Sequence, residues 1–191
     1  MTLKSPADAK TMLRLALREQ RRALSKATPD AGEQAAALLP AELLAAKVVA
    51  GYWPQPVEID PTSLMRRFAE AGVRLALPVA PNRDTPLAFR AWFPGDPLTP
   101  DAHGISAPTS AAPLVRPDFV IVPLLAFDRT GGRMGQGGGH YDRTLAALRA
   151  QGQVFALGLA FAGQEIAGLP TEPHDQKLDA ILTEKAYIEV S

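Results

Sequence analysis

The sequence has 191 residues, which is enough for one domain with a substantial hydrophobic core. Lysine plus arginine and aspartate plus glutamate both number 20, so the balanced charge gives no support for a nucleic-acid or membrane partner. Cysteine is absent, which excludes disulfides and thiolate chemistry.

No apolar leader and no run of 18 apolar residues is visible, so we expect a cytoplasmic protein with a single domain over residues 1–191. The first predicted element is an amphipathic helix over residues 5–25 with leucines on its apolar side. Four basic residues recur in it at every fourth position: Lys10, Arg14, Arg18 and Arg22. Like charges at this spacing repel mildly. A solvent-exposed face and a phosphate-binding face explain this basic stripe equally well.

The next part of the chain alternates between helical and extended patterns. An alanine-rich helix is predicted over residues 30–44, a strand over 47–53, a helix over 61–71 and a strand over 73–79. The order strand, helix, strand at these lengths predicts a right-handed crossover and a parallel sheet. Glu58 precedes the second of these helices. An acid there commonly serves the helix N-terminus, which is the alternative to a binding role.

The second half of the chain adds further strands. Residues 87–94 alternate well enough for a strand, and residues 119–125 form an apolar run typical of a buried parallel strand. A helix is predicted from Arg143 onward, followed by a buried strand over 153–161 and a last short strand over 180–184.

A glycine-rich loop lies between the strand at 119–125 and the helix that follows Asp142. Six of the nine residues at 131–139 are glycine. Bare backbone N–H groups at the start of a helix can close on an anion. The loop lacks the Gly-Lys-Ser/Thr of a Walker A motif, and it does not meet the dinucleotide fingerprint. A flexible linker is the alternative, but a linker needs neither a buried strand before it nor Arg133, Tyr141 and Asp142 within it.

Residues 133–143, RMGQGGGHYDR, resemble the R-L-G-x-G-x-G-Y-Y-D segment of the 5-formyltetrahydrofolate cyclo-ligase family, also called 5,10-methenyltetrahydrofolate synthetases. Lys10 with Leu13 and Arg14 matches the Lys-x-x-Leu-Arg of that family. The loop at 169–179 matches its P-x-x-x-x-D-x-x-L/V-D pattern, and Glu58 lies in the same strand–Glu–helix context. The resemblance extends from about residue 10 to residue 184.

The resemblance implies an α/β fold: a three-layer α/β/α sandwich with a mainly parallel sheet. It would be similar to the group of glucosamine-phosphate isomerases, ribose-phosphate isomerases and CoA-transferases. The implied activity is the ATP- and Mg²⁺-dependent cyclisation of 5-formyltetrahydrofolate to 5,10-methenyltetrahydrofolate, with release of ADP and phosphate. We expect a monomer that acts on this small molecule, with ATP and Mg²⁺ as cofactors and without a nucleic-acid or membrane partner.

The resemblance also implies roles for single residues. The nucleotide would be bound by Lys10, Arg14, Arg133, Met134, Gly135, Gln136, Gly137, Gly138, Gly139, His140, Tyr141 and Asp142. The folate would be bound by Trp53, Glu58, Trp92 and His140, although a tryptophan in a strand is equally well explained as core. Arg133 and Glu58 would be catalytic, and Asp142 with Asp175 would hold Mg²⁺.

Three positions depart from the family pattern. His140 replaces a tyrosine, Gln136 stands at a variable site that is often aromatic or basic, and Ala107 replaces the acid of Gly-Ile-x-Glu-Pro. His140 could still stack and form hydrogen bonds with a folate. His174 has no histidine partner at a metal-binding spacing, so we expect a loop residue there.

Two other functions remain open on the sequence. A sugar-phosphate isomerase or transferase on the same fold would need neither ATP nor Mg²⁺, and the two aspartates argue against it. A non-catalytic folate- or nucleotide-binding relative is favoured only by Ala107 and His140. Such a protein would bind ATP or folate without forming product, so turnover separates it from the enzyme.

Overall fold

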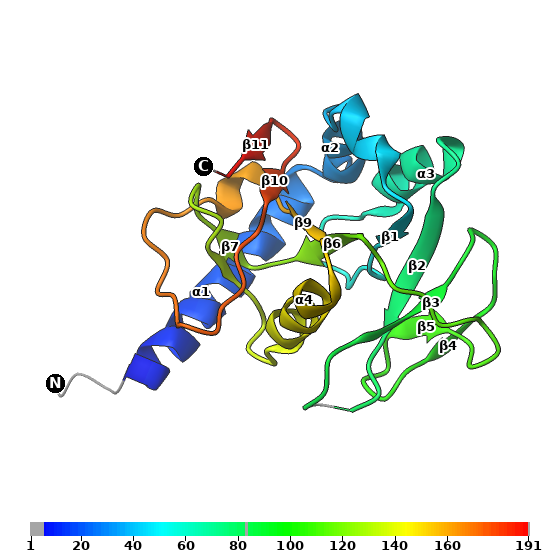
Figure 1. Cartoon of the computed structure of the whole chain (residues 1–191). Coiled ribbons are helices and arrows are strands. Elements are labelled where there is room, and N and C mark those ends of the chain that lie inside the picture. The colour runs from blue at the N-terminus through cyan, green and yellow to red at the C-terminus, as the bar shows by residue number, and fades with distance from the viewer. Residues whose placement is uncertain (1–5, 83, 191) are drawn as a thin grey trace, which may run out of the picture.

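The computed structural model describes residues 6–82 and 84–190 and has an α/β architecture in three layers (Figure 1). The described chain contains a seven-stranded sheet with the strand order β11-β10-β9-β6-β1-β2-β3. Its five inner strands run parallel, and only the edge strands β3 and β11 are antiparallel to their neighbours. The prediction of a mainly parallel sheet is therefore confirmed. The sheet comprises β1 (Val48–Ala50), β2 (Arg74–Val79), β3 (Ala88–Ala91), β6 (Phe119–Pro123), β9 (Phe155–Leu159), β10 (Ala180–Leu182) and β11 (Tyr187–Glu189).

Helices cover both faces of this sheet. Figure 1 shows α2 and α3 on one side and α4 on the other. The helices are α1 (Pro6–Ala27), α2 (Ala31–Ala37), α3 (Thr62–Glu70) and α4 (His140–Gln151), with the short 3₁₀ helices η1 (Ala41–Ala45) and η2 (Ala162–Gln164). Side chains of β6 alternate between the two faces, as the pleat of a strand requires. Phe119 and Ile121 join the core under α2 and α3, whereas Val120 and Val122 join the core under α4.

Two small antiparallel hairpins flank the sheet. One pairs β4 (Leu98–Pro100) with β5 (Ser106–Pro108), and neither strand was predicted from the sequence. Ala107 lies buried in β5, so the residue that departs from the family pattern is a packed apolar side chain. The other hairpin pairs β7 (Ala126–Phe127) with β8 (Arg133–Met134) and carries the first half of the glycine loop.

The N-terminal helix α1 packs beside the β7–β8 hairpin, and its Leu24 reaches the core under α2 and α3. Leu17 shares a small buried cluster with Leu125, Met134 and Leu169. This packing brings the N-terminal half of α1 next to the glycine loop. No helix in the described part of the chain is long and apolar enough to cross a membrane.

The structure corrects three predicted elements. The single helix predicted over 30–44 is wrong: α2 ends at Ala37, and a 3₁₀ turn begins at Ala41. Pro40 explains the break, because proline has no N–H to donate in a helix interior. The strand at 180–184 is not the last, since β11 follows it as an antiparallel edge. The helix after the glycine loop begins at His140 rather than Arg143.

Candidate active site

A cavity of about 720 Å³ opens where the parallel strands end. Residues within three positions of the ends of β1, β2 and β6 form part of its wall, namely Trp53, Ala80 and Leu124. Ligands in open α/β sheets bind at this carboxyl edge. All the site residues predicted from the sequence line this cavity except Trp92.

The glycine loop forms one wall of the cavity. It leaves β8 at Met134 and enters α4 through Gly139, which occupies the N-cap position with φ 66°. Gly137 also has a positive φ, of 105°. Side chains at these two positions would be strained, so glycine is required for the path of the loop. The loop thus delivers the N-terminus of α4 to the cavity, and the first N–H groups of a helix have no partner within the helix.

Two basic residues of α1 lie opposite this loop. Lys10 Nζ forms an ion pair with Glu172 Oε1 at 2.6 Å, and Arg14 Nε donates to the carbonyl oxygen of Gly135 at 3.3 Å. A Cβ atom on Gly137 would lie 3.4 Å from the guanidinium carbon of Arg14, so the loop passes directly over that side chain. Lys10 and Arg14 therefore place positive charge beside the glycine loop, whose backbone N–H groups are suited to binding an anion.

The basic stripe predicted on α1 does not act as one unit. Arg18 Nε donates to Gln136 Oε1 at 2.9 Å, so this exposed side chain is bonded to the glycine loop. Arg22 is exposed and pairs with Glu19 at 3.1 Å. Spacing of four drifts around a helix of 3.6 residues per turn, which explains why Lys10 and Arg14 reach the cavity and Arg22 does not.

Glu58 lies deep in the cavity wall. Its Oε1 accepts a hydrogen bond from Arg21 at 3.2 Å, and its Oε2 accepts one from the Gln55 backbone N–H at 3.1 Å. The N-terminus of α3 is served by Asp60 instead, which accepts from the Thr62 N–H at 2.8 Å. The alternative of Glu58 as a helix-capping acid therefore does not hold.

Two tyrosines near Glu58 have their pKa raised. Burial is the main cause for both Tyr52 and Tyr141, and the negative charge of Glu58 adds to it. A tyrosine hydroxyl is protonated at neutral pH in any case, and the raised pKa keeps both protonated at higher pH too. The Tyr52 hydroxyl donates to the Ile59 carbonyl at 2.6 Å and thereby fixes the turn that carries Glu58.

The two tryptophans differ in their relation to the cavity. Trp53 lines it and remains partly exposed. Trp92 packs against the core under α2 and α3, and its ring meets that of Trp53 edge-on at a centroid distance of 6.3 Å. Trp92 thus supports Trp53, and its direct role in folate binding stays a prediction.

Arg133 and Asp142 form a compact unit at the cavity. Arg133 is buried, and its Nη2 lies 2.6 Å from Asp142 Oδ1. The same oxygen accepts the Gln176 N–H at 3.0 Å, and Arg133 also donates to the Gln176 carbonyl. One carboxylate oxygen of Asp142 is therefore engaged with the 169–179 loop, while Oδ2 has no hydrogen bond from another described residue.

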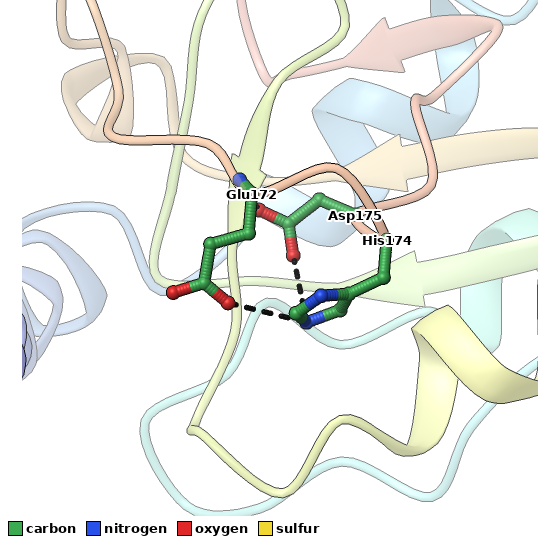
Figure 2. A group of neighbouring side chains, drawn as sticks. All are labelled: Glu172, His174 and Asp175. Carbon is green, nitrogen blue, oxygen red and sulfur yellow. Dashed lines mark hydrogen bonds and ion pairs between the residues drawn. The ribbon is translucent and has the colours of Figure 1, made fainter.

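The 169–179 loop brings a second set of ligating atoms to the cavity. Figure 2 shows the His174 ring between the carboxylates of Glu172 and Asp175. His174 Nε2 lies 3.2 Å from Glu172 Oε2 and 3.8 Å from Asp175 Oδ1. One ligating atom from each of the three side chains falls within 4.8 Å of the others, a spacing that could hold a metal ion. His174 lies in a loop as predicted, with its side chain 71% exposed.

His140 stands at the first position of α4 and contacts His103 of the β4–β5 connection. The two rings meet edge-on at a centroid distance of 5.3 Å. Burial, and then the nearby Arg143 and His103, lower the pKa of His140. Its Nε2 is buried without a hydrogen-bond partner among the residues that the structure describes. A neutral imidazole with a free nitrogen can accept from, or donate to, a bound ligand.

The comparisons with known proteins agree with these motifs. The model of the 5-formyltetrahydrofolate cyclo-ligase family matches residues 6–184. The chain belongs to this cyclo-ligase family. A 5-formyltetrahydrofolate cyclo-ligase of Mycolicibacterium smegmatis is 32% identical over 189 residues, which cover 94% of this chain and 96% of the relative. The cyclo-ligase of Escherichia coli K12 is 34% identical over 87% of this chain and 96% of its own length.

Solved structures of the cyclo-ligase family share the fold. The 5,10-methenyltetrahydrofolate synthetase of Aquifex aeolicus superposes with a TM-score of 0.72 and 28% identity, covering 95% of this chain and 92% of the other. The synthetase of Mycoplasma pneumoniae gives a TM-score of 0.69 at 21% identity, covering 92% and 98%, and so supports the fold alone. The likeness to the wider isomerase and CoA-transferase group stays a prediction.

Several cavity residues of this cyclo-ligase family member were not predicted from its sequence: Arg21, Tyr52, Asp101, His103 and Glu172. Arg21 had a usable signal, because it lies between Leu17 and Leu24 in the apolar pattern of α1. A charged residue at a buried helical position usually has a specific partner. Asp101 and His103 had no such signal, since the β4–β5 hairpin that carries them was not predicted.

Proposed function

We propose that this protein cyclises 5-formyltetrahydrofolate to 5,10-methenyltetrahydrofolate, using ATP and Mg²⁺ and releasing ADP and phosphate. The observation that carries the proposal is a single cavity with two chemically different walls. One wall combines the glycine loop with the cations Lys10 and Arg14, and suits phosphates. The other wall combines Trp53 with the buried carboxylate of Glu58, and suits a flat ring with N–H donors.

The chemistry needs no nucleophile from the protein. The formyl oxygen of the folate attacks the γ-phosphorus of ATP, and ADP leaves. N10 of the folate then attacks the formyl carbon and loses its proton, and the oxygen departs as inorganic phosphate with closure of the five-membered ring. The protein's contribution is to align the two substrates and to stabilise charge at the transferring phosphoryl group.

Arg133 is the residue we assign to charge stabilisation on the glycine-loop side. It is buried, and its pairing with Asp142 and Gln176 fixes its guanidinium before any ligand arrives. Fixed charges cost little reorganisation during a reaction, which is why preorganised groups stabilise a transition state effectively. Glu58, in contrast, holds the folate ring by accepting its N–H groups.

Asp142 and Asp175 are the residues we assign to Mg²⁺. Both carboxylates line the cavity on the phosphate side and offer the hard anionic oxygens that this ion prefers. The ion would neutralise phosphate charge when bound. Glu172 belongs to the same cluster as Asp175, so it is a further candidate ligand once a phosphate displaces it from Lys10.

The test is a direct assay of the purified protein with 5-formyltetrahydrofolate and MgATP, in which the absorbance of the acid-stable methenyl product is recorded. We expect product formation that depends on both ATP and Mg²⁺. The absence of product above a no-enzyme control, while both ligands bind, would leave the non-catalytic binder as the function. Product without ATP would exclude the phosphoryl-transfer route.

A further inference from the structure

The cavity-facing side of α1 carries one charged residue that the proposed chemistry does not yet use. The positions that point inward are spaced alternately by four and three residues: Lys10, Arg14, Leu17, Arg21 and Leu24. Leu17 is buried and Leu24 packs against the core, so Arg21 lies between two apolar contacts. It is nevertheless a charged residue with only 3% of its surface exposed.

Arg21 is tied to Glu58 and to the end of β6. Its Nη1 donates to Glu58 Oε1 at 3.2 Å and to the Leu124 carbonyl at 3.3 Å. The two side chains of the ion pair are 4% and 7% exposed, yet both line the cavity. Arg21 Nε is buried with no hydrogen-bond partner in the described part of the chain.

A buried ion pair of this kind is a poor way to stabilise a fold. Removing two charges from water costs several kcal/mol per ion, and apolar residues of similar volume often stabilise a protein as well or better. Breaking such a pair from one side leaves the other charge without compensation. The pair is therefore better explained by what it does at the cavity than by the stability it contributes.

We infer that Arg21 is a positioning residue, which fixes the Glu58 carboxylate so that its unused lone pairs face the folate ring. This inference rests on the proposed function. Each carboxylate oxygen has two acceptor sites, and one site on each is taken by Arg21 and by the Gln55 N–H. One acceptor site on each oxygen is left for a ligand with adjacent N–H donors. Arg21 itself need not touch the substrate.

The test is a double-mutant cycle on the binding of 5-formyltetrahydrofolate, measured by titration calorimetry with the parent, Arg21→Met, Glu58→Gln and the double variant. We expect Arg21→Met to weaken folate binding by about ten- to a hundred-fold, which is the range for a charge-assisted interaction. In the Glu58→Gln background the same change should cost less than about threefold. MgATP affinity should stay within about twofold of the parent.

Two further variants separate positioning from folding. Arg21→Lys keeps the charge but not the forked geometry, so it should recover part of the folate affinity. Arg22→Met, at the neighbouring exposed position, is the matched control and should bind folate as the parent does. In turnover, Arg21→Met should raise the KM for folate more than it lowers kcat. If Arg21→Met does not fold, folate binding is compared between the parent, Arg21→Lys, Glu58→Gln and the double variant instead.

The outcomes are distinct for each proposal. An equal loss in the Glu58→Gln background, or an equal loss of MgATP affinity, overturns the positioning role of Arg21. A parent that binds the folate without turnover overturns the cyclo-ligase activity and leaves the positioning role in place. A parent that turns over while Arg21→Met binds folate normally overturns only the positioning role. A parent that binds no reduced folate overturns both.

Discussion

The carboxylate of Asp142 accepts hydrogen bonds from two residues and is also a proposed metal ligand. Its Oδ1 accepts from the buried Arg133 and from the Gln176 N–H, and its second oxygen is the one we assign to Mg²⁺. The side chain thus connects the glycine loop, the 169–179 loop and the proposed metal. Local stability and metal affinity should therefore respond together when its charge is removed.

Asp142→Asn tests this double role. We expect a lower rate at low Mg²⁺ that is partly restored by raising Mg²⁺, because an amide is a poorer ligand for this ion. We also expect a loss of about 1–3 kcal/mol in the free energy of unfolding, since a hydrogen-bonded charge pair with a buried arginine is removed. Rate against Mg²⁺ and urea denaturation measure the two effects. A normal rate at low Mg²⁺ would show that Asp142 has a structural role alone.

Arg14 decides between the two explanations of the basic stripe. Its contact with Gly135 and its place in the cavity wall favour phosphate binding. Arg14→Ala should raise the KM for ATP and lower kcat, with a combined loss of about ten- to a hundred-fold for one charge-assisted hydrogen bond. Arg22→Ala is the matched control: it removes the same charge from the exposed side and should leave kinetics unchanged. If the Arg14→Ala protein is more stable and its KM for ATP is unchanged, α1 does not take part in ATP binding.

Single residues of the site could be predicted only where a motif marked them. The glycine loop, Lys10 and Arg14 lie in short segments with recognisable spacing, and all line the cavity. Asp101 and His103 reach the same cavity through tertiary packing, which depends on where the β4–β5 hairpin is placed. The prediction that Lys10 and Arg22 lie on one face of the helix was wrong. Residues spaced by four drift around a helix of 3.6 residues per turn, so the two side chains point in different directions.

At the scale of elements, the β7–β8 hairpin depends on one buried acid. Asp128 Oδ1 accepts from the Thr130 N–H at 2.9 Å, from the Thr130 hydroxyl at 2.7 Å and from the Gly132 N–H at 3.1 Å. Burial alone would raise the pKa of Asp128, but the hydrogen bonds from Thr130 and Gly132 outweigh it and hold the pKa below its ordinary value. The charged carboxylate therefore stabilises the turn that leads into the glycine loop.

Asp128→Asn should lower the free energy of unfolding by about 1–2 kcal/mol at pH 7. Because the folded-state pKa is depressed, the stabilisation is complete above the ordinary pKa of about 4 and is lost as the pH falls through the folded-state value. The difference between parent and variant should therefore shrink below about pH 4. Urea denaturation at a series of pH values measures it, and a difference that does not change with pH would contradict the role of the charge.

The glycine loop allows a comparison of two glycines only two positions apart. Gly137 has φ 105° and would place a Cβ atom against Arg14, whereas Gly135 has neither a positive φ nor a neighbour within 4 Å of an added Cβ. Gly137→Ala should cost about 1–2 kcal/mol in the free energy of unfolding and should weaken MgATP binding. Gly135→Ala should change the free energy of unfolding by less than about 0.5 kcal/mol. Equal losses would mean that the path of the loop does not depend on the conformation of Gly137.

Predicted elements were correct where periodicity was long and uninterrupted. α1 and the parallel strands β6 and β9 are examples, because each buries a continuous apolar pattern. The prediction of a single alanine-rich helix was wrong because the high alanine content was given more weight than Pro40, which interrupts the helix. The short strands β4, β7, β8 and β11 have two or three residues each, too few for any periodic signal. Their pairing is decided by neighbours distant in sequence.

The whole molecule supplies the cavity from segments spread along the chain. α1, the end of β1, the β4–β5 hairpin, the glycine loop and the 169–179 loop all contribute residues. A ligand bound among them should stabilise the complete fold. At a MgATP concentration of 100 times Kd, the gain is about 2.7 kcal/mol, or roughly 5–10 °C in Tm for a chain of this size. Thermal unfolding with and without MgATP measures it, and Arg14→Ala should show a smaller shift at the same concentration. An identical shift in both would contradict phosphate binding by Arg14.

The Lys10–Glu172 ion pair joins residues 162 positions apart, and this has a consequence for the protein during its synthesis. Ribosomes add about 5–20 residues per second, so roughly 8–30 seconds separate the appearance of the two partners. For that interval α1 has emerged with its cationic side chains but without the loop that completes the cavity. A ligand that needs the complete cavity therefore cannot stabilise the nascent chain until the 169–179 loop has been synthesised.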